Sequence, residues 1–186
     1  MAHILRYSFI LSTFFYCSSA TSYAYSFFGS MTDGNSWHQA AEELEKSPDI
    51  RYKFSDYKVK IENIKPDKNP ILNRYPQESA GFKKAQKFSR YRSIINDGLS
   101  KGVNFAGHFS FITWGCGTEC VEAVIVNVKT GKIYGYLNSH FGFAFKENSR
   151  LLVADVWASE DTKILYPEVE RSYWLWDGKT LKKLRN

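Results

Sequence analysis

The sequence predicts an α+β fold, in which one long helix covers a face of an antiparallel β-meander of about seven strands. Two observations predict it. Residues 79–99 place apolar side chains, among them Ile95 and Leu99, at helical spacing. From Phe105 onward, short runs of strand-forming residues alternate with turns. A small propeller-like all-β fold is the alternative, because a hairpin that ends in a Trp-Asp-Gly turn (Trp176 to Gly178) resembles propeller blade strands. The strand region is too short to close such a ring.

Residues 1–24 have the pattern of a secretory signal peptide. A weakly basic start that includes Arg6 precedes the apolar run Tyr7–Cys17 and a stretch of small residues that ends at Ala24. Cleavage after Ala20 is the alternative. Because the apolar run is too short to span a bilayer, we expect a periplasmic or secreted protein with no stable membrane anchor after cleavage.

Charge and length constrain the protein that remains. Loss of the signal peptide removes Arg6 and no acidic residue, which lowers the formal net charge from +6 to +5. A moderately basic protein has affinity for nucleic acid, an anionic envelope surface or an acidic protein. Export makes nucleic acid the least expected of these, and we predict no nucleic-acid partner. We predict a flexible lead-in over residues 25–36 and a single domain over residues 37–186.

The first half of this domain is predicted to contain two helices and one strand. Trp37–Glu45 predicts a short helix with Ser36 as its N-cap. Tyr57–Ile64 alternates apolar with charged residues, which predicts a half-buried strand. The prolines of Pro66–Pro76 predict a loop, and Ser79–Leu99 is the predicted long helix.

The second half is predicted to be a succession of hairpins. Gly131 can take the positive φ that the tight turn over Lys129–Lys132 requires. The predicted strands are Phe105–Trp114, Cys120–Val128, Ile133–Leu137, Phe141–Phe145, Arg150–Trp157, Ser172–Trp176 and Leu181–Leu184.

Cys116 and Cys120 are predicted to form a disulfide. They flank Gly117-Thr118-Glu119, and if those three residues form a hairpin loop, the cysteines face each other at disulfide distance. An oxidising compartment favours the bond. Closing so small a ring stabilises the fold by about 2 kcal/mol on the loop-entropy model. Its larger effect is to hold the loop in one shape and to fix where Trp114 and Glu119 point.

Three other chemistries of the cysteine pair stay open. A redox-active pair is normally spaced CxxC at a helix N-terminus, where the thiolate is stabilised. A zinc site would require His108 and His140 beside the two thiolates. A cysteine nucleophile would require a free thiol with one of these histidines as its base. A structural disulfide fits the spacing best, and we predict no metal and no cofactor.

Strand alternation divides the side chains of Phe105–Trp114 between two faces. The phenylalanines Phe105, Phe109 and Phe111 share the face expected beneath the helix, whereas the other face carries polar and aromatic groups. On a later strand Asp155 and Trp157 share a face. If these faces coincide, they form either a binding surface or a second packed core with satisfied polar groups. The residues involved are His108, Ser110 and Trp114, which share their strand face with Ile112, together with Asp155 and Trp157.

The evidence for catalysis is weak. The sequence contains no GxSxG, HExxH, P-loop or dinucleotide motif. Glu119, Glu122 and Asp155 are carboxylates of the strand region, but glycosidase chemistry depends on a separation between carboxylates that sequence does not supply. The enzyme alternative is an envelope hydrolase that uses His108 with Glu119 or Asp155.

The run Gly102–Phe109 (GVNFAGHF), continued by WGCGTEC at Trp114–Cys120, resembles a family of exported bacterial proteins of unknown function. In that family N-F-A-G-H-aromatic is followed by W-G-C-G-small-x-C, a K-T-G-K turn and an aromatic-W-D-G segment. The last two match Lys129–Lys132 and Trp174–Gly178. Asn127 stands where the family is expected to prefer aspartate. The resemblance, which runs from Phe82 to Leu184, implies an envelope protein and no particular reaction.

Together these observations predict an exported, non-catalytic binding protein of the inhibitor or immunity type. The disulfide-pinned loop and the adjacent strand face would contact another protein of the cell envelope. A rigid loop that carries a carboxylate fits an active site well, because preorganisation lowers the ordering cost of binding. The predicted binding residues are Trp114, Glu119, His108, Ser110 and Trp157.

Overall fold

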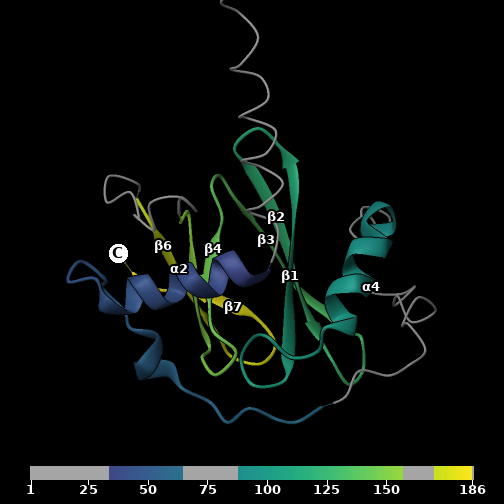
Figure 1. The fold of residues 1–186 in the computed structure, drawn as a ribbon, viewed down its shortest axis with the longest axis horizontal. Coiled ribbons are helices and arrows are strands. Elements are labelled where there is room, and N and C mark those ends of the chain that lie inside the picture. Colours follow the sequence, from purple (N-terminus) through teal and green to yellow (C-terminus); the bar gives the residue numbers. More distant parts are fainter. Residues whose placement is uncertain (1–33, 65–87, 157–169, 186) are drawn as a thin grey trace, which may run out of the picture.

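Two antiparallel sheets contain all seven strands of the part of the chain that the structure describes (Figure 1). The structure is a computed structural model that describes residues 34–64, 88–156 and 170–185. The first sheet has the order β1-β2-β3, with β1 at Phe109–Gly117, β2 at Cys120–Asn127 and β3 at Ile133–Ser139. The second has the order β4-β5-β6-β7, with β4 at Phe143–Phe145, β5 at Leu151–Ala154, β6 at Ser172–Trp176 and β7 at Leu181–Lys183.

Short helices cover the outer faces of the two sheets. Helix α2 (Gly34–Lys46) and the 3₁₀ turn η1 (Phe54–Tyr57) pack on the second sheet, and α2 contacts β4. The 3₁₀ turn η2 (Ser89–Tyr91) leads directly into α4 (Arg92–Ser100), which packs on β1 of the first sheet. The order of layers is therefore α4, first sheet, second sheet and α2.

The largest hydrophobic cluster lies between the sheets. Phe109 and Phe111 of β1 meet Phe143 and Phe145 of β4 in this cluster, and Trp176 of β6 joins them. The rings contact at angles, as the 5.1 Å separation and 77° tilt of Phe111 and Phe143 illustrate, which is the arrangement that aromatic quadrupoles favour.

Helix α2 is tied to the first sheet as well as to the second. The Trp37 indole N–H donates to Thr113 Oγ1 at 3.2 Å, and both side chains are buried. Ala40, Ala41 and Leu44 of the same helix pack instead into the cluster on the outer face of the second sheet. One short helix thus bridges two layers.

Seven strands are present, as predicted, although the first begins at Phe109 and not at Phe105, and β5 spans only Leu151–Ala154. The short helix predicted at Trp37–Glu45 is confirmed with an earlier start. Because α2 begins at Gly34, Ser36 lies inside the helix and the prediction that it is the N-cap is wrong. The strands form two packed sheets with a shared core, which is neither a single meander nor a ring of propeller blades.

The described residues do not contain the long helix that the sequence predicts. Of the predicted helix Ser79–Leu99, the described portion consists of a 3₁₀ turn and a nine-residue helix. Ile95 and Leu99 are buried against β1, as the helical spacing predicted. They pack on the face of Ile112 and Trp114, so the prediction that the helix covers the phenylalanine face is wrong; that face packs on the second sheet. The remainder of the predicted helix lies outside the described residues, as do the predicted signal peptide, most of the lead-in, and the loop Pro66–Pro76.

The strand predicted at Tyr57–Ile64 is wrong. This segment begins in the turn η1 and continues as an extended chain with one isolated bridge, Lys58 to Ser149. Its backbone bonds to two different loops, because Val59 N–H donates to Asn148 O and Glu62 N–H donates to Gly107 O. The alternation does not mark a buried face here, because Ile61 is 43% exposed. Among the described helices, none is long and apolar enough to cross a membrane.

Candidate functional site

The β1–β2 hairpin ends in a two-residue turn, Thr118-Glu119, that is exposed to solvent. Gly117 pairs with Cys120 across the neck of the turn, so Gly117 belongs to the strand and not to the loop. Glu119 has a φ of 51°, and Gly117 has a φ of 140°. A left-handed conformation is uncommon at a glutamate, so the turn holds this residue in one defined orientation. The turn forms the free end of the hairpin in Figure 1.

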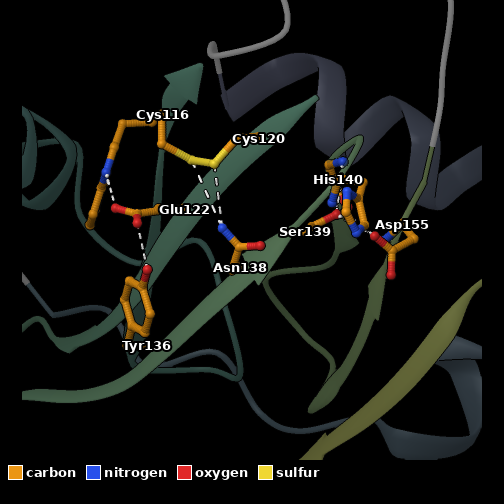
Figure 2. Close-up of a disulfide and its surroundings, with 10 residues drawn as sticks. Cys116, Cys120, Glu122, Tyr136, Asn138, Ser139, His140 and Asp155 are labelled. Atoms are coloured by element: carbon orange, nitrogen blue, oxygen red, sulfur yellow. Dashed lines mark hydrogen bonds between the residues drawn. A yellow bond between two sulfur atoms is a disulfide. The ribbon is translucent and has the colours of Figure 1, made fainter. Parts of the chain in front are cut away.

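The predicted disulfide is confirmed. Cys116 and Cys120 are bonded, with their Cα atoms 5.1 Å apart (Figure 2). The strand register shifts between Gly115 and Gly117, which makes Cys116 the extra residue of a β-bulge. The bulge, and not a three-residue loop, therefore brings the two cysteines together.

Asn138 of β3 lies against the disulfide. Its side-chain Nδ2 is 3.4 Å from Cys120 Sγ and 3.9 Å from Cys116 Sγ (Figure 2). The bond between the sulfurs leaves neither thiol available as a nucleophile or a zinc ligand. Among the residues that the structure describes, no group of three or more histidines, cysteines or carboxylates is placed to hold a metal.

A buried carboxylate lies directly beneath the hairpin tip. Glu122 Oε2 accepts a hydrogen bond from Trp114 Nε1 at 3.0 Å, and Oε1 accepts one from the Tyr136 hydroxyl at 2.5 Å (Figure 2). The Tyr91 ring stacks on the Trp114 indole at 4.5 Å, so α4 and η2 cover this face of the sheet. The face predicted to carry Ser110, Ile112 and Trp114 is therefore a second packed core.

A second polar cluster joins the two sheets beside the tip. Ser139 Oγ accepts hydrogen bonds from the backbone N–H groups of Gly142 and Asp155, at 3.0 and 3.1 Å. Asp155 Oδ1 lies 3.0 Å from this hydroxyl and accepts a bond from the backbone N–H of His140 (Figure 2). A serine, a histidine and an aspartate are thus adjacent, but the histidine contributes its backbone and the serine hydroxyl is occupied. The arrangement braces the fold and does not have the geometry of a catalytic triad.

The residues of the enzyme alternative lie at opposite ends of the first sheet. His108 precedes β1, where its Nδ1 is 3.8 Å from Glu62 Oε1, whereas Glu119 follows β1. The strand between them is roughly 26 Å long, at about 3.3 Å per residue. Asp155 contacts Ser139, which pairs with Val121 near the tip, so it too is distant from His108. Neither carboxylate is placed to work with this histidine.

The other predicted binding residues are dispersed. Ser110 and Trp114 are buried, at 0% and 2% exposure, so they do not contribute to an exposed surface. His108 stands apart from the row in which it was predicted, because the chain turns before β1 begins at Phe109. Trp157 lies outside the described residues.

Comparisons with protein-family models, curated proteins and solved structures find no match for this chain. Its function is therefore argued from the geometry of its own residues.

Two residues beside the tip did not figure in the sequence prediction of the site. Asn138 belongs to a strand that was predicted to end at Leu137, and its place against the disulfide follows from the register of β2 and β3. Tyr136 carries the hydroxyl that reaches Glu122. A signal was available for Tyr136, since a glutamate within an apolar strand requires polar partners on the neighbouring strands.

Proposed function

We propose that this chain is an exported, non-catalytic binding protein of the inhibitor or immunity type, and that the tip of the β1–β2 hairpin is its contact surface. The observation that carries the proposal is the exposed turn Thr118-Glu119 with a disulfide directly behind it. Because the turn already has one shape, a partner that binds it loses little conformational entropy. The partner is another protein of the cell envelope.

Exposed polar side chains surround the turn. Glu119 supplies a carboxylate, Thr118 a hydroxyl and Asn138 an amide, and His140 lies one residue beyond the pair of Val121 with Ser139. This contact surface is smaller and more polar than the aromatic face that the sequence predicted. Its single carboxylate fits a cationic pocket in a partner.

The non-catalytic part of the proposal is supported by the separation of His108 from both Glu119 and Asp155 along the first sheet. It is further supported by the hydrogen bonds that occupy the Ser139 hydroxyl and the Asp155 carboxylate. General acid–base chemistry requires a group within hydrogen-bond reach of a reacting atom. The Ser139 hydroxyl and the Asp155 carboxylate instead accept hydrogen bonds from backbone N–H groups.

Export is supported by the disulfide, because such bonds persist in oxidising compartments. The pattern of residues 1–24 agrees with it. The resemblance to exported bacterial proteins points to the same compartment.

Affinity capture with the mature protein as bait tests the proposal. A bound envelope protein is purified, and its dissociation from wild type and variants is followed by surface plasmon resonance. We expect Glu119→Gln to raise the dissociation constant by about tenfold or more, as loss of one partner of a desolvated charge pair does. Replacing both cysteines with serine should weaken binding without abolishing it.

Two matched variants make the result specific. Asp49→Asn removes an exposed carboxylate far along the chain from the tip, and His108→Ala removes the histidine of the enzyme alternative; both should bind the partner as wild type does. Equal affinities for wild type, Glu119→Gln and the double serine variant would exclude the tip as the contact surface. Turnover of a substrate that disappears in His108→Ala would exclude the non-catalytic proposal.

A further inference from the structure

In the part of the chain that the structure describes, two side-chain donors are buried without a hydrogen-bond partner. They are Nε of Arg150 and Nε1 of Trp176, and no other side-chain nitrogen or oxygen among the described residues is in this condition. A buried N–H without an acceptor destabilises the fold, because it loses its hydrogen bonds to water and gains none in return. Native proteins therefore rarely keep such groups without a reason.

The two donors come from neighbouring strands. The backbone N–H of Trp176 donates to the carbonyl oxygen of Arg150 at 3.0 Å, one register step beyond the pair of Leu151 with Leu175. Residues directly opposite in an antiparallel pair carry their side chains on one face, with Cβ atoms about 5 Å apart. Both orphan donors thus start from adjacent points of the backbone.

Within the described part of the chain, the guanidinium of Arg150 also lacks an acidic partner. Among the described residues, no carboxylate lies within ion-pair distance of it, although its side chain is half-buried. The acid next to Trp176 in sequence is Asp177. Its carboxylate accepts hydrogen bonds from the backbone N–H groups of Lys179 and Thr180 and forms an ion pair with Lys182 at 3.1 Å. A partly buried cation with no counter-charge is unusual, because buried charges are normally paired.

The surroundings are aromatic and basic. The Trp176 indole packs edge-on against Phe109 at 5.1 Å and against Tyr134 at 6.0 Å. His108 lies against the same Phe109 ring at 4.1 Å, and Lys132 Nζ lies 4.9 Å from the centre of the Tyr134 ring. Two cationic or potentially cationic side chains, His108 and Lys132, therefore lie beside the rings that pack on the Trp176 indole. The carboxylate of Glu62 lies 3.8 Å from His108 Nδ1.

We infer that Arg150 and Trp176 form a binding site for a carboxylate. The Nε–H and one terminal N–H of a guanidinium are parallel and match the two oxygens of a carboxylate, and the indole N–H from the adjacent strand supplies a third donor to the same group. The ligand is a small organic carboxylate or the carboxyl-terminal group of a peptide. This site is separate from the hairpin tip, because Phe109 and Gly117 lie at opposite ends of β1, roughly 26 Å apart.

An ordered water is the simplest other acceptor for two orphan donors. Occupancy of the site by a carboxylate depends on the carboxylate concentration and on the positive charge of Arg150, whereas occupancy by water depends on neither. They are distinguished by the indole N–H signal of Trp176 in nuclear magnetic resonance spectra of the isotope-labelled mature protein, assigned by its loss in Trp176→Phe. Benzoate is titrated at constant ionic strength against sodium chloride.

We expect a saturable shift of the Trp176 indole signal with benzoate and none with chloride. Arg150→Gln should weaken benzoate binding by about tenfold or more, and Arg150→Lys should weaken it less, because charge remains but the fork is lost. Lys132→Gln is the matched control, since it removes a nearby positive charge without touching the donors. Thermal unfolding of each variant verifies that it is folded, and the two Arg150 variants give independent readings if one fails to fold.

The source of the carboxylate is distinguished by a short peptide tested with a free and with an amidated carboxyl terminus. If the peptide with a free carboxyl terminus binds more tightly than benzoate, the ligand is the carboxyl terminus of a peptide. If that peptide binds more weakly than benzoate, the ligand is a small organic carboxylate. The inference is overturned if benzoate causes no saturable shift, if Arg150→Gln leaves the shift unchanged, or if Lys132→Gln weakens binding as much. Tighter binding of inorganic phosphate than of benzoate would overturn the assignment to a carboxylate.

Discussion

The indole N–H of Trp114 donates to the carboxylate of Glu122 at 3.0 Å, across the antiparallel pair of β1 and β2. The two residues are directly opposite in register, and both are buried. The other carboxylate oxygen accepts the hydroxyl of Tyr136 on β3. One acidic group therefore links all three strands of the first sheet beneath the hairpin tip.

Removal of this acid should destabilise the protein. Glu122→Ala removes the acceptor of the buried Trp114 indole N–H and of the half-buried Tyr136 hydroxyl, and we expect the free energy of unfolding to fall by about 3 kcal/mol. Urea denaturation followed by circular dichroism measures it. Glu119→Ala removes an exposed glutamate three residues away and should change stability by no more than about 0.5 kcal/mol. Similar values for the two variants would contradict the structural role of Glu122.

Reduction of the disulfide should destabilise the protein without unfolding it. Cys116 and Cys120 are separated by four positions in the chain, so reduction should lower the free energy of unfolding by about 2 kcal/mol. The protein should stay folded, because the three hydrophobic clusters do not depend on the bond. Denaturation with and without reductant, together with a free-thiol count, checks this. The double serine variant should be insensitive to reductant, and complete unfolding on reduction would be the contrary result.

A methyl group at Gly142 should be poorly tolerated. A Cβ built there lies 2.2 Å from Cη2 of the buried Trp37 ring, and a rigid ring cannot move aside easily. We expect Gly142→Ala to cost about 2 kcal/mol or more through overpacking. Gly115→Ala is the matched control, because a Cβ at that position meets nothing within 4 Å. Thermal denaturation of both variants is the measurement, and a tolerated Gly142→Ala would place α2 elsewhere.

Acidification should destabilise the protein through His38. Burial lowers the pKa of this histidine from 6.5, although Glu147, the backbone of Phe145 and Glu42 act to raise it. The unfolded chain then binds more protons than the folded one as the pH falls below 6.5. Stability should therefore be complete above that pH and decrease below it. His38→Gln should flatten the decrease between about pH 7 and pH 5, whereas His108→Gln should retain it.

The sequence by itself determined the features that depend on residues close together in the chain. The strand predicted at Ser172–Trp176 has those bounds in the structure, because alternation and a turn residue such as Gly178 act within a few residues. The disulfide was predictable for the same reason, since its partners are close in the chain and the resulting ring is small. Ile95 and Leu99 followed from the periodicity of one helix.

Tertiary structure decided what covers each face. Alternation placed Trp114 and Ser110 together, but whether that face met solvent or α4 depended on how distant elements packed. The segment Tyr57–Ile64 had strand periodicity and found no strand to pair with, because a sheet also requires a free neighbouring edge. The separation of His108 from Glu119, and the meeting of Arg150 with Trp176, depend on register between strands. Register is a relation between distant segments, set by the packing of the whole core.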